Sequence, residues 1–389
     1  MSPISALPGR PAEAAPLTVT VTDQPSPAAL AQWRQLVATS PEGDVAQLPE
    51  WAGLRATVGF QVRYLLVHAG PGGELLGGAQ ILERPLPLLG RVGYLPYGPL
   101  VAAGPDADPA VSAALCAALT ELGHTRLRML FVQPPPGGEA ISRELLHRGF
   151  RDSEANIAPR QTLRLDLSNE LSALRGGLSK RLRTWTNRWE SRGVTVRLGT
   201  QSDVPVLAEL VARSGEHQGF AAVSADYLST LLRDLGGEPG REDGHAVLFV
   251  GELAGRPVAA ALFTRCAGTL KLRFAGMDRD EAASRSNVPA AVQWHAIEWA
   301  RRAGLRWFDF GGISAEAAAA LARGESRDSV RGVDRFKASF GGQLHRAAPP
   351  VELISNPVLR AGYDVSRRWA LGRRLIELAK AALRTGRLR

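Results

Sequence analysis

The alternation of apolar and polar residues in the first half of the chain predicts helices, a hairpin and several further strands. Apolar runs on either side of Gly70-Pro71-Gly72-Gly73 are typical of two strands joined by a turn. The predicted elements are, in order, a helix at 27–39, strands at 64–67 and 75–82, an extended stretch at 92–100, a helix at 109–122, a strand at 127–132, a short helix at 142–147 and a strand at 162–167 that closes this half.

The second half repeats that order of elements. The expected elements are a helix at 204–213 capped by Asp203, a hairpin of 247–251 and 258–264, a third strand at 270–277, a helix from the cap Asn287 to Ala303, and a strand at 307–310. A meander followed by a helix and a parallel strand, present twice, indicates a duplicated α/β domain. That order is found in the GNAT acyltransferase fold, so we expect two GNAT-like domains in tandem around a shared cleft.

Residues 171–193 show a clear helical pattern between the two halves. Apolar residues recur at steps of four, four, three and four, at Leu174, Leu178, Leu182, Trp185 and Trp189. A stripe of this kind makes the tryptophans core residues first of all. Three basic residues, Lys180, Arg181 and Arg183, project beside the stripe.

The net charge of +9 comes from two basic stretches. Residues 171–193 hold six basic residues and one acidic residue, residues 366–389 hold eight and one, and the rest of the chain is slightly acidic. Such patches suggest a polyanionic partner, although charged helices are also often only solvated faces. The last stretch has apolar residues among its arginines, so it suits either anionic lipid or packing on the first domain.

The length of the chain and its cysteines limit the number of domains and the cellular compartment that can be expected. A chain of 389 residues is long enough for two domains, and its apolar runs are too short to span a membrane. Cys116 and Cys266 have no metal-ligand spacing, and we interpret them as buried thiols in a reducing compartment, which predicts the cytoplasm. The seven histidines are scattered, so we expect no metal.

One lysine stands in a position suited to chemistry. Phe336 and Phe340 are four residues apart and would anchor a helical turn that leaves Lys337 on another face, while Gly341-Gly342 ends the turn. Lys337 would then be a positioned cation. The alternative is an ordinary surface lysine on a packing helix.

The sequence lacks the coenzyme A site of an acyl-CoA-dependent GNAT enzyme. Such a site needs a glycine-rich turn whose N–H groups hold the pyrophosphate at a helix N-terminus. The corresponding stretches are 280–289, which has two acids, a proline and no glycine, and 103–109, which is acidic and interrupted by proline. We therefore expect no coenzyme A, and another activated acyl carrier is implied.

From about Asp44 to about Leu359 the chain resembles the Fem family (FemA, FemB, FemX), aminoacyl-tRNA-dependent transferases that build peptidoglycan interpeptide bridges. The resemblance rests on a series of short sequence markers, none of which is specific alone, whereas the ordered set of them is. The markers are Gln47-Leu48-Pro49-Glu50-Trp51, Tyr97-Gly98-Pro99, 161–167, 192–196, Trp294 with Ile297-Glu298-Trp299-Ala300, Phe308-Asp309-Phe310-Gly311-Gly312-Ile313, Phe336-Lys337, Phe340-Gly341-Gly342 and Asn356-Pro357.

The resemblance implies roles for individual residues. The Phe-Lys pair, Phe336 and Lys337, would lie beside the reacting ester, with Lys337 stabilising the tetrahedral intermediate and the tRNA end. Arg55 would hold the diphosphate of the acceptor, although family members more usually have a lysine at this position. A second diphosphate-binding arginine is expected on the meander of the second domain, where Arg273 is the nearest candidate. The markers Trp51 and Tyr97 are expected at the same acceptor site, and Lys180, Arg181 and Arg183 would follow the tRNA backbone.

Elementary chemistry agrees with those roles. An aminoacyl ester is already activated, so the enzyme has mainly to orient the amine and stabilise the oxyanion, where a fixed donor is worth roughly 3–4 kcal/mol. The sequence singles out no general base. Asp309 is possible, but it could instead bond the Gly311-Gly312 turn.

The resulting hypothesis is a cytoplasmic aminoacyltransferase, for which a peripheral location at the inner face of the cell membrane stays open. Its partners would be aminoacyl-tRNA and a UDP-linked or lipid-linked peptidoglycan precursor. The expected organisation is a tail at 1–16, domains at 17–163 and 164–345, a return segment at 346–365 and a basic amphipathic helix at 366–389, without the long helical hairpin of FemA-like members. The alternatives are another acyl donor or a polysaccharide or lipid acceptor, and a non-catalytic RNA- or membrane-binding scaffold.

Overall fold

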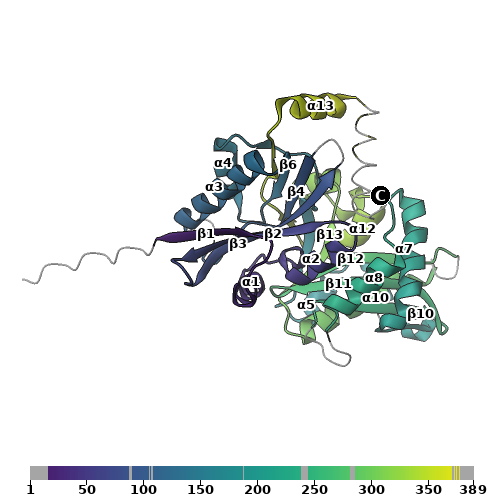
Figure 1. Cartoon of the computed structure of the whole chain (residues 1–389). Helices are drawn as coiled ribbons and strands as arrows, with labels where there is room; N and C mark the ends of the chain where they lie inside the picture. The colour runs from purple at the N-terminus through teal and green to yellow at the C-terminus, as the bar shows by residue number, and fades with distance from the viewer. Residues whose placement is uncertain are drawn as a thin grey trace, which may run out of the picture.

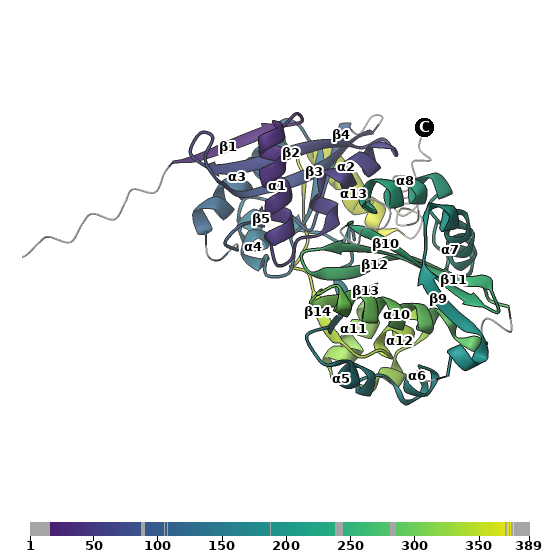
Figure 2. The same ribbon diagram turned by 90° about the horizontal axis from the view of Figure 1, so that it is seen from below.

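The protein consists of two α/β domains, each built on its own sheet (Figures 1 and 2). The computed structural model describes residues 16–86, 90–104, 106, 108–186, 188–237, 244–280, 285–369, 372, 374 and 376. All but the last residue of the expected tail at 1–16, and most of the expected helix at 366–389, therefore lie outside the described residues.

The first domain carries a mixed sheet flanked by helices. Its elements are β1 (Leu17–Thr22), α1 (Pro27–Thr39), η1 (Val45–Gln47), α2 (Pro49–Ala56), β2 (Gln61–Ala69), β3 (Leu75–Leu86), β4 (Gly90–Pro96), β5 (Leu100–Val101), α3 (Pro109–Thr125), β6 (Met129–Gln133), α4 (Glu139–His147) and β7 (Arg151–Asp152). The chain returns to this domain with β15 (Val351–Ile354) and α13 (Pro357–Arg368).

The second domain holds the remaining elements. They are β8 (Gln161–Asp166), α5 (Leu171–Gly176), α6 (Lys180–Trp185), η2 (Glu190–Arg192), β9 (Val194–Leu198), η3 (Gln201–Asp203), α7 (Val204–Gln218), α8 (Ala225–Leu235), β10 (Ala246–Leu253), β11 (Arg256–Cys266), β12 (Thr269–Met277), α10 (Val288–Arg302), β13 (Trp307–Gly312), α11 (Ala315–Ala322), η4 (Arg327–Ser329), α12 (Gly332–Ala338) and β14 (Gln343–Arg346).

Both sheets contain the predicted meander followed by a helix and a parallel strand. The first has the order β1-β2-β3-β4-β6-β15-β7, with β5 beside β3, and β4 and β6 are parallel. The second has the order β14-β8-β13-β12-β11-β10-β9, with β12 and β13 parallel. The helices α3 and α10 make the two crossovers. The predicted duplication is confirmed.

Two sequence-based assignments are wrong. The strand expected at 162–167 does not close the first half, because β8 pairs antiparallel with β13 and β14 in the second sheet. The boundary expected between 163 and 164 therefore falls inside a strand of the second domain. In addition, Asp203 does not cap α7 with its side chain; it accepts from the Thr200 backbone N–H at 2.8 Å in a capping box one turn earlier.

The apolar stripe at 171–193 is also not one helix. It is divided into α5, α6 and the short η2, because Gly176-Gly177 follows α5 and the Ser179 side chain caps a new helix. Its leucines are buried in the core of the second domain, as the stripe predicted. The tryptophans are only partly buried, and the guanidinium of Arg192 lies 4.4 Å from the ring centroid of Trp185.

A third apolar core joins the two domains. Besides one cluster inside each domain, buried residues of α1 and α2 pack with buried residues of α7, α8, β10 and β11. The two domains are therefore held against each other over a continuous apolar contact. In the described part of the chain the longest helix is α3, with 17 residues, and no helix there is both long and apolar enough to cross a membrane.

Candidate active site

Lys337 lies where β12 and β13 separate. The parallel pairing of these strands ends at Lys271 and Asp309. Beyond that point the Lys337 Nζ donates a hydrogen bond to the carbonyl oxygen of Gly312. Gly311 has a φ of +77°, and a Cβ at this position would lie 3.9 Å from the Lys337 Nζ. A glycine is therefore what the backbone conformation favours here, and a Cβ would also lie only 3.2 Å from the Leu272 carbonyl oxygen.

The helix of Lys337 is anchored as its sequence predicted. On α12, Phe336 packs edge-on against Phe340 with 5.3 Å between ring centroids, and Phe340 lies 5.2 Å from Phe310 in the core. Phe336 is thus a packing residue that holds the turn. Burial lowers the pKa of Lys337, and the nearby Asp334 and Asp309 oppose this in part. Lys337 is a partly buried lysine whose ammonium is held in place by the Gly312 carbonyl.

Asp309 has the contacts of a structural carboxylate. It is fully buried, and its Oδ2 accepts from the Thr162 hydroxyl at 3.0 Å and from the Arg164 Nε at 3.1 Å. Its Oδ1 accepts from the backbone N–H of Gly311 at 2.8 Å. Of the two roles left open by the sequence, the contacts favour the one that fixes the glycine turn, because both oxygens are occupied.

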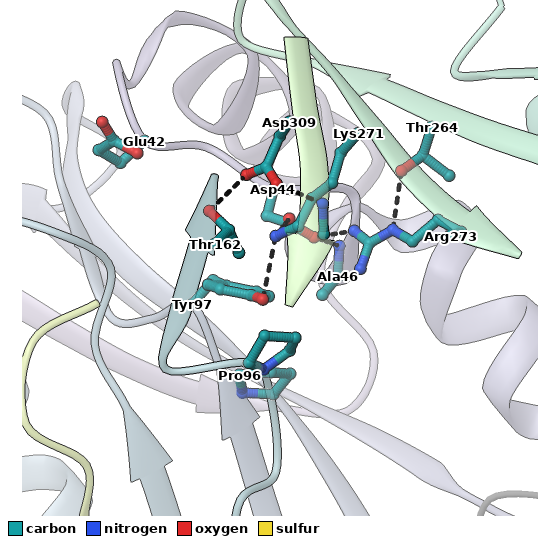
Figure 3. Close-up of polar contacts among 12 residues, drawn as sticks. Glu42, Asp44, Ala46, Pro96, Tyr97, Thr162, Thr264, Lys271, Arg273 and Asp309 are labelled. Atoms are coloured by element: carbon teal, nitrogen blue, oxygen red, sulfur yellow. Dashed lines mark hydrogen bonds and ion pairs between the residues drawn. The ribbon is translucent and has the colours of Figure 1, made fainter. Parts of the chain in front are cut away.

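A buried ion cluster crosses the domain boundary next to this site (Figure 3). Asp44, from the first domain, accepts from the Lys271 Nζ at 3.1 Å and from the guanidinium of Arg273, both on β12. Burial alone would raise the pKa of Asp44, but Arg273 and Lys271 outweigh it and hold this pKa well below its usual value. Lys271 also donates to the Tyr97 hydroxyl at 3.0 Å and lies 4.0 Å from the centre of its ring.

A second carboxylate of the first domain extends the cluster. Glu42 accepts from the Arg164 Nη1 at 2.9 Å, and His345 lies 3.2 Å from the same carboxylate. Arg164 therefore joins Glu42 to Asp309, and the two domains are linked by polar contacts as well as by the shared apolar core. The described residues contain no group of three or more His, Cys, Asp or Glu side chains placed to hold a metal ion.

All four residues expected at the acceptor site line one pocket between the domains. The pocket has a volume of about 650 Å³ and includes Trp51, Arg55, Tyr97 and Arg273. The guanidinium of Arg273 lies 5.3 Å from the centre of the Trp51 ring, so the ion pair with Asp44 also positions this tryptophan.

The guanidinium of Arg55 packs against aromatic rings at the same pocket. Its guanidinium lies 4.6 Å from the centre of the Phe60 ring, and its Nη1 donates to the Tyr227 hydroxyl at 3.2 Å. Arg84 is 5.4 Å from the same Phe60 ring, and its pKa is lowered by burial and by the neighbouring Arg55. Arg55 therefore lines the pocket, and a second cation, Arg84, lies close behind it against the same Phe60 ring.

Away from this end, the pocket is strongly apolar. Strands β4 and β6 contribute Tyr94 and Phe131, whose rings are stacked 5.6 Å apart. Tyr363, on α13, lies 6.2 Å from Phe131 and closes the wall, and Ile376 beyond α13 also lines the pocket. The pocket can therefore hold a ligand with an anionic part and an extended apolar part.

The three basic residues of α6 are exposed close to the helix of Lys337. Lys180, Arg181 and Arg183 all face solvent. The N-terminus of α6 is fixed to the end of α12, because the Ser179 backbone N–H donates to the Ser339 carbonyl at 2.8 Å. A basic surface thus adjoins the positioned lysine.

Sequence reasoning missed the central role of Asp44 and Lys271. A signal was present, since Lys271 and Arg273 alternate on one face of an otherwise apolar strand, and a charged residue buried in a sheet requires a partner. The partner could not be found in that way, because Asp44 is 227 residues away along the chain.

Known proteins with similar sequences are acyltransferases. A family profile described as an acetyltransferase (GNAT) domain matches residues 177–337. Lipid II:glycine glycyltransferase of Staphylococcus aureus is 27% identical over 228 residues, which are 56% of this chain and 52% of that protein. The Staphylococcus epidermidis protein of the same name is 28% identical over 237 residues, covering 57% and 54%. This chain spans about half the length of these curated relatives.

Among solved structures, FemX superposes with a TM-score of 0.71 at 20% identity, covering 85% of this chain and 98% of FemX. The resemblance to the Fem family is confirmed. The tandem GNAT-like architecture is confirmed with it, since a tandem GNAT protein from the clavulanic acid biosynthesis pathway also superposes, with a TM-score of 0.50 at 13% identity over 88% of this chain and 99% of its own. Within this fold, Lys337 lies in the second GNAT-like domain, and the pocket lined by Trp51, Arg55, Tyr97 and Arg273 lies between the two domains.

Proposed function

We propose that this protein is an aminoacyltransferase that moves an amino acid from aminoacyl-tRNA to a side-chain amine of a peptidoglycan stem peptide. The observation that carries the proposal is the position of Lys337, a partly buried cation held by the Gly312 carbonyl where the pairing of β12 and β13 has ended, together with an interdomain pocket that Arg55 and Arg273 line. The names of the staphylococcal relatives support a peptidoglycan precursor as the acceptor.

The chemistry asks little of the protein beyond position and charge. The acceptor amine attacks the ester carbonyl, the new C–N bond forms, and the C–O bond to the tRNA ribose breaks. The proton lost by the amine leaves with the tRNA hydroxyl or to solvent. Lys337 would stabilise the oxyanion in between, an effect worth roughly 3–4 kcal/mol for one fixed donor. The donor would place the reaction in the cytoplasm.

The charged surfaces suit the two substrates. The exposed basic residues of α6, next to α12, would contact the tRNA backbone without reading its sequence. Arg55 would contact the diphosphate of the acceptor. Arg273, already paired with Asp44, would act mainly by holding Trp51 at the pocket wall.

The family profile favours a second candidate, transfer from acetyl-CoA. Against it stands the N-terminus of α10, where Pro289 occupies the first turn and has no N–H to offer a pyrophosphate. The glycine-free stretch that precedes α10 includes 281–284, which lie outside the described residues.

The deciding experiment measures transfer of labelled amino acids from a mixed aminoacyl-tRNA pool. UDP-linked and lipid-linked pentapeptide are tested in parallel as acceptors, and acetyl-CoA as the alternative donor. Label that arrives from tRNA and is lost after RNase treatment is the expected result. Transfer from acetyl-CoA alone would show that the tRNA assignment is wrong.

Two variants test the roles of the residues. Lys337→Ala is expected to lower kcat by about 10²–10³-fold with little effect on tRNA binding, and normal turnover would remove Lys337 from the mechanism. Replacing Lys180, Arg181 and Arg183 by alanine is expected to weaken tRNA binding and reduce its salt dependence. The matched control is Arg143→Ala, an exposed arginine on α4 of the first domain.

A further inference from the structure

The helix α13 has its apolar side turned to solvent and its charged side turned to the protein. Along 359–367 the positions that face the protein are polar or aromatic for the most part, and Arg360, Asp364 and Arg367 are among them. The exposed positions are Pro357, Val358, Ala361, Gly362, Val365, Arg368 and Trp369. A helix packed only for folding would show the opposite arrangement.

Specific contacts fix this orientation. The Arg360 Nη1 donates to Glu352, a fully buried carboxylate on β15, at 2.8 Å. Arg367 forms an ion pair with Glu154, and the ring of Tyr363 packs against Phe131 of β6. The helix cannot turn its apolar side inward without breaking these contacts, so the exposed apolar face is a built feature of the domain.

The exposed apolar residues form one stripe. Val358 is 79% exposed, Val365 is 52% exposed and Trp369 is 70% exposed. Val358 and Val365 are seven residues apart, which places them on one side of the helix, and Trp369 follows directly after the last helical residue, Arg368. Figure 1 shows α13 at the outer edge of the molecule.

We infer that this face of α13 docks on the surface of an anionic lipid bilayer. Valine and tryptophan side chains insert at the boundary between headgroups and acyl chains, and arginines beside them bind lipid phosphates. Arg368 is exposed beside the stripe, and the sequence that follows, 370–389, contains six basic residues and one acidic residue. Apolar residues bordered by basic ones have the charge complement of anionic lipid.

The same charges argue against two other occupants. A second copy docking on this face through a two-fold axis would bring two identical basic patches together. The chain's own segment after residue 369 has six basic residues and one acidic residue, so it carries the same sign of charge as the basic end of α13.

The docking surface rests on α13 alone. That it also delivers a lipid-linked acceptor rests on the proposed function, because Tyr363 on the inner side of the same helix lines the proposed acceptor pocket. Docking would place this wall of the pocket at the bilayer surface.

The test is co-sedimentation of the full-length protein with vesicles of mixed phosphatidylglycerol and phosphatidylcholine, or of phosphatidylcholine alone. We expect binding to the anionic vesicles and at least about tenfold weaker partitioning for the double variant Val358→Asp/Val365→Asp, and also for Trp369→Ala. The matched control is Val19→Asp, another exposed valine, on β1. All variants are exposed-site changes, and circular dichroism checks that they remain folded.

Four results would overturn the inference. They are no binding of the wild-type protein to anionic vesicles, equal binding to both kinds of vesicle, variants that bind as the wild type does, and a concentration-dependent dimer that the same substitutions abolish. Since binding is measured without donor or acceptor, these results are independent of the proposed transferase activity.

Discussion

Replacing Asp44 by asparagine tests how the two domains are held together. The side chain of Asp44 is buried between them, 3.1 Å from the Lys271 Nζ and paired with Arg273, and one of its oxygens accepts from the Ala46 backbone N–H at 2.9 Å. Asparagine keeps the size and can still accept from Ala46. What it removes is the negative charge, so two buried cations remain without this carboxylate.

The expected loss is large. Removing one partner of a buried ion pair costs about 3–5 kcal/mol, because the remaining charge stays desolvated. Whole domains have unfolding free energies of about 5–15 kcal/mol, so the variant should be clearly less stable. Because the carboxylate and the cations come from different domains, the loss should appear as earlier separation of the domains, with two unfolding transitions instead of one.

Urea unfolding, followed by tryptophan fluorescence and circular dichroism, measures both the loss of stability and the number of unfolding transitions. The control is Asp234→Asn, which removes an exposed pair with Arg233 at 2.9 Å and should cost less than about 1 kcal/mol. If Asp44→Asn shifts the unfolding curve no further than this control, the cluster does not hold the interface and the reasoning is refuted.

The pH dependence of the same pair of proteins gives a second check. The pKa of Asp44 is lowered in the folded protein, so its contribution is complete above the unfolded value of about 3.9 and is lost as the pH falls below it. The difference between wild type and Asp44→Asn should therefore be constant from about pH 5 to 8 and shrink below about pH 4. A difference that grows on acidification would contradict the assignment.

Two further predictions concern other buried groups. The lowered pKa of Lys337 means that its charge opposes folding at neutral pH, so Lys337→Met should raise the urea midpoint at pH 7 while lowering kcat by about 10²–10³-fold; an unchanged or lower midpoint would contradict this. Burial raises the pKa values of Cys116 and Cys266 to about 12, so neither thiol should react with Ellman's reagent at pH 8 until urea unfolds the protein, and a thiol that reacts before unfolding would show that its burial is incomplete.

Local signals in the sequence predicted most of the elements and their order. The helix at 27–39 was found to the residue because Ser26 caps it and Pro27 begins it, both of which act within one turn. The two meanders were found because turn residues such as those at 70–73 separate apolar runs. The apolar stripe at 171–193 does not reveal the break at Gly176-Gly177 that separates α5 from α6. The helices α8 and α11 are not among the predicted elements.

Features that depend on distant pairing were missed. Whether β8 joins the first or the second sheet is decided by its partners β13 and β14, which are far away along the chain. The same holds for the site: Lys337 and its glycine turn carry recognisable local patterns, and the resemblance to the Fem family supplied Arg55, Trp51 and Tyr97. The pairing of Asp44 with Lys271 has no local pattern, since it exists only once the domains have met.

The duplicated fold explains why one domain would hold the acyl donor and the other would not. In the second domain the parallel strands pair only up to Asp309, and the gap beyond is occupied by the Gly311 turn and the ammonium of Lys337. In the first domain β4 and β6 remain paired along all of 92–96, so no gap opens. There the paired residues Tyr94 and Phe131 stack and line the acceptor pocket instead. The same strand arrangement thus loses its pairing beside Lys337 in one copy, where the proposed acyl donor would bind, and forms a closed aromatic wall in the other, where the proposed acceptor would bind.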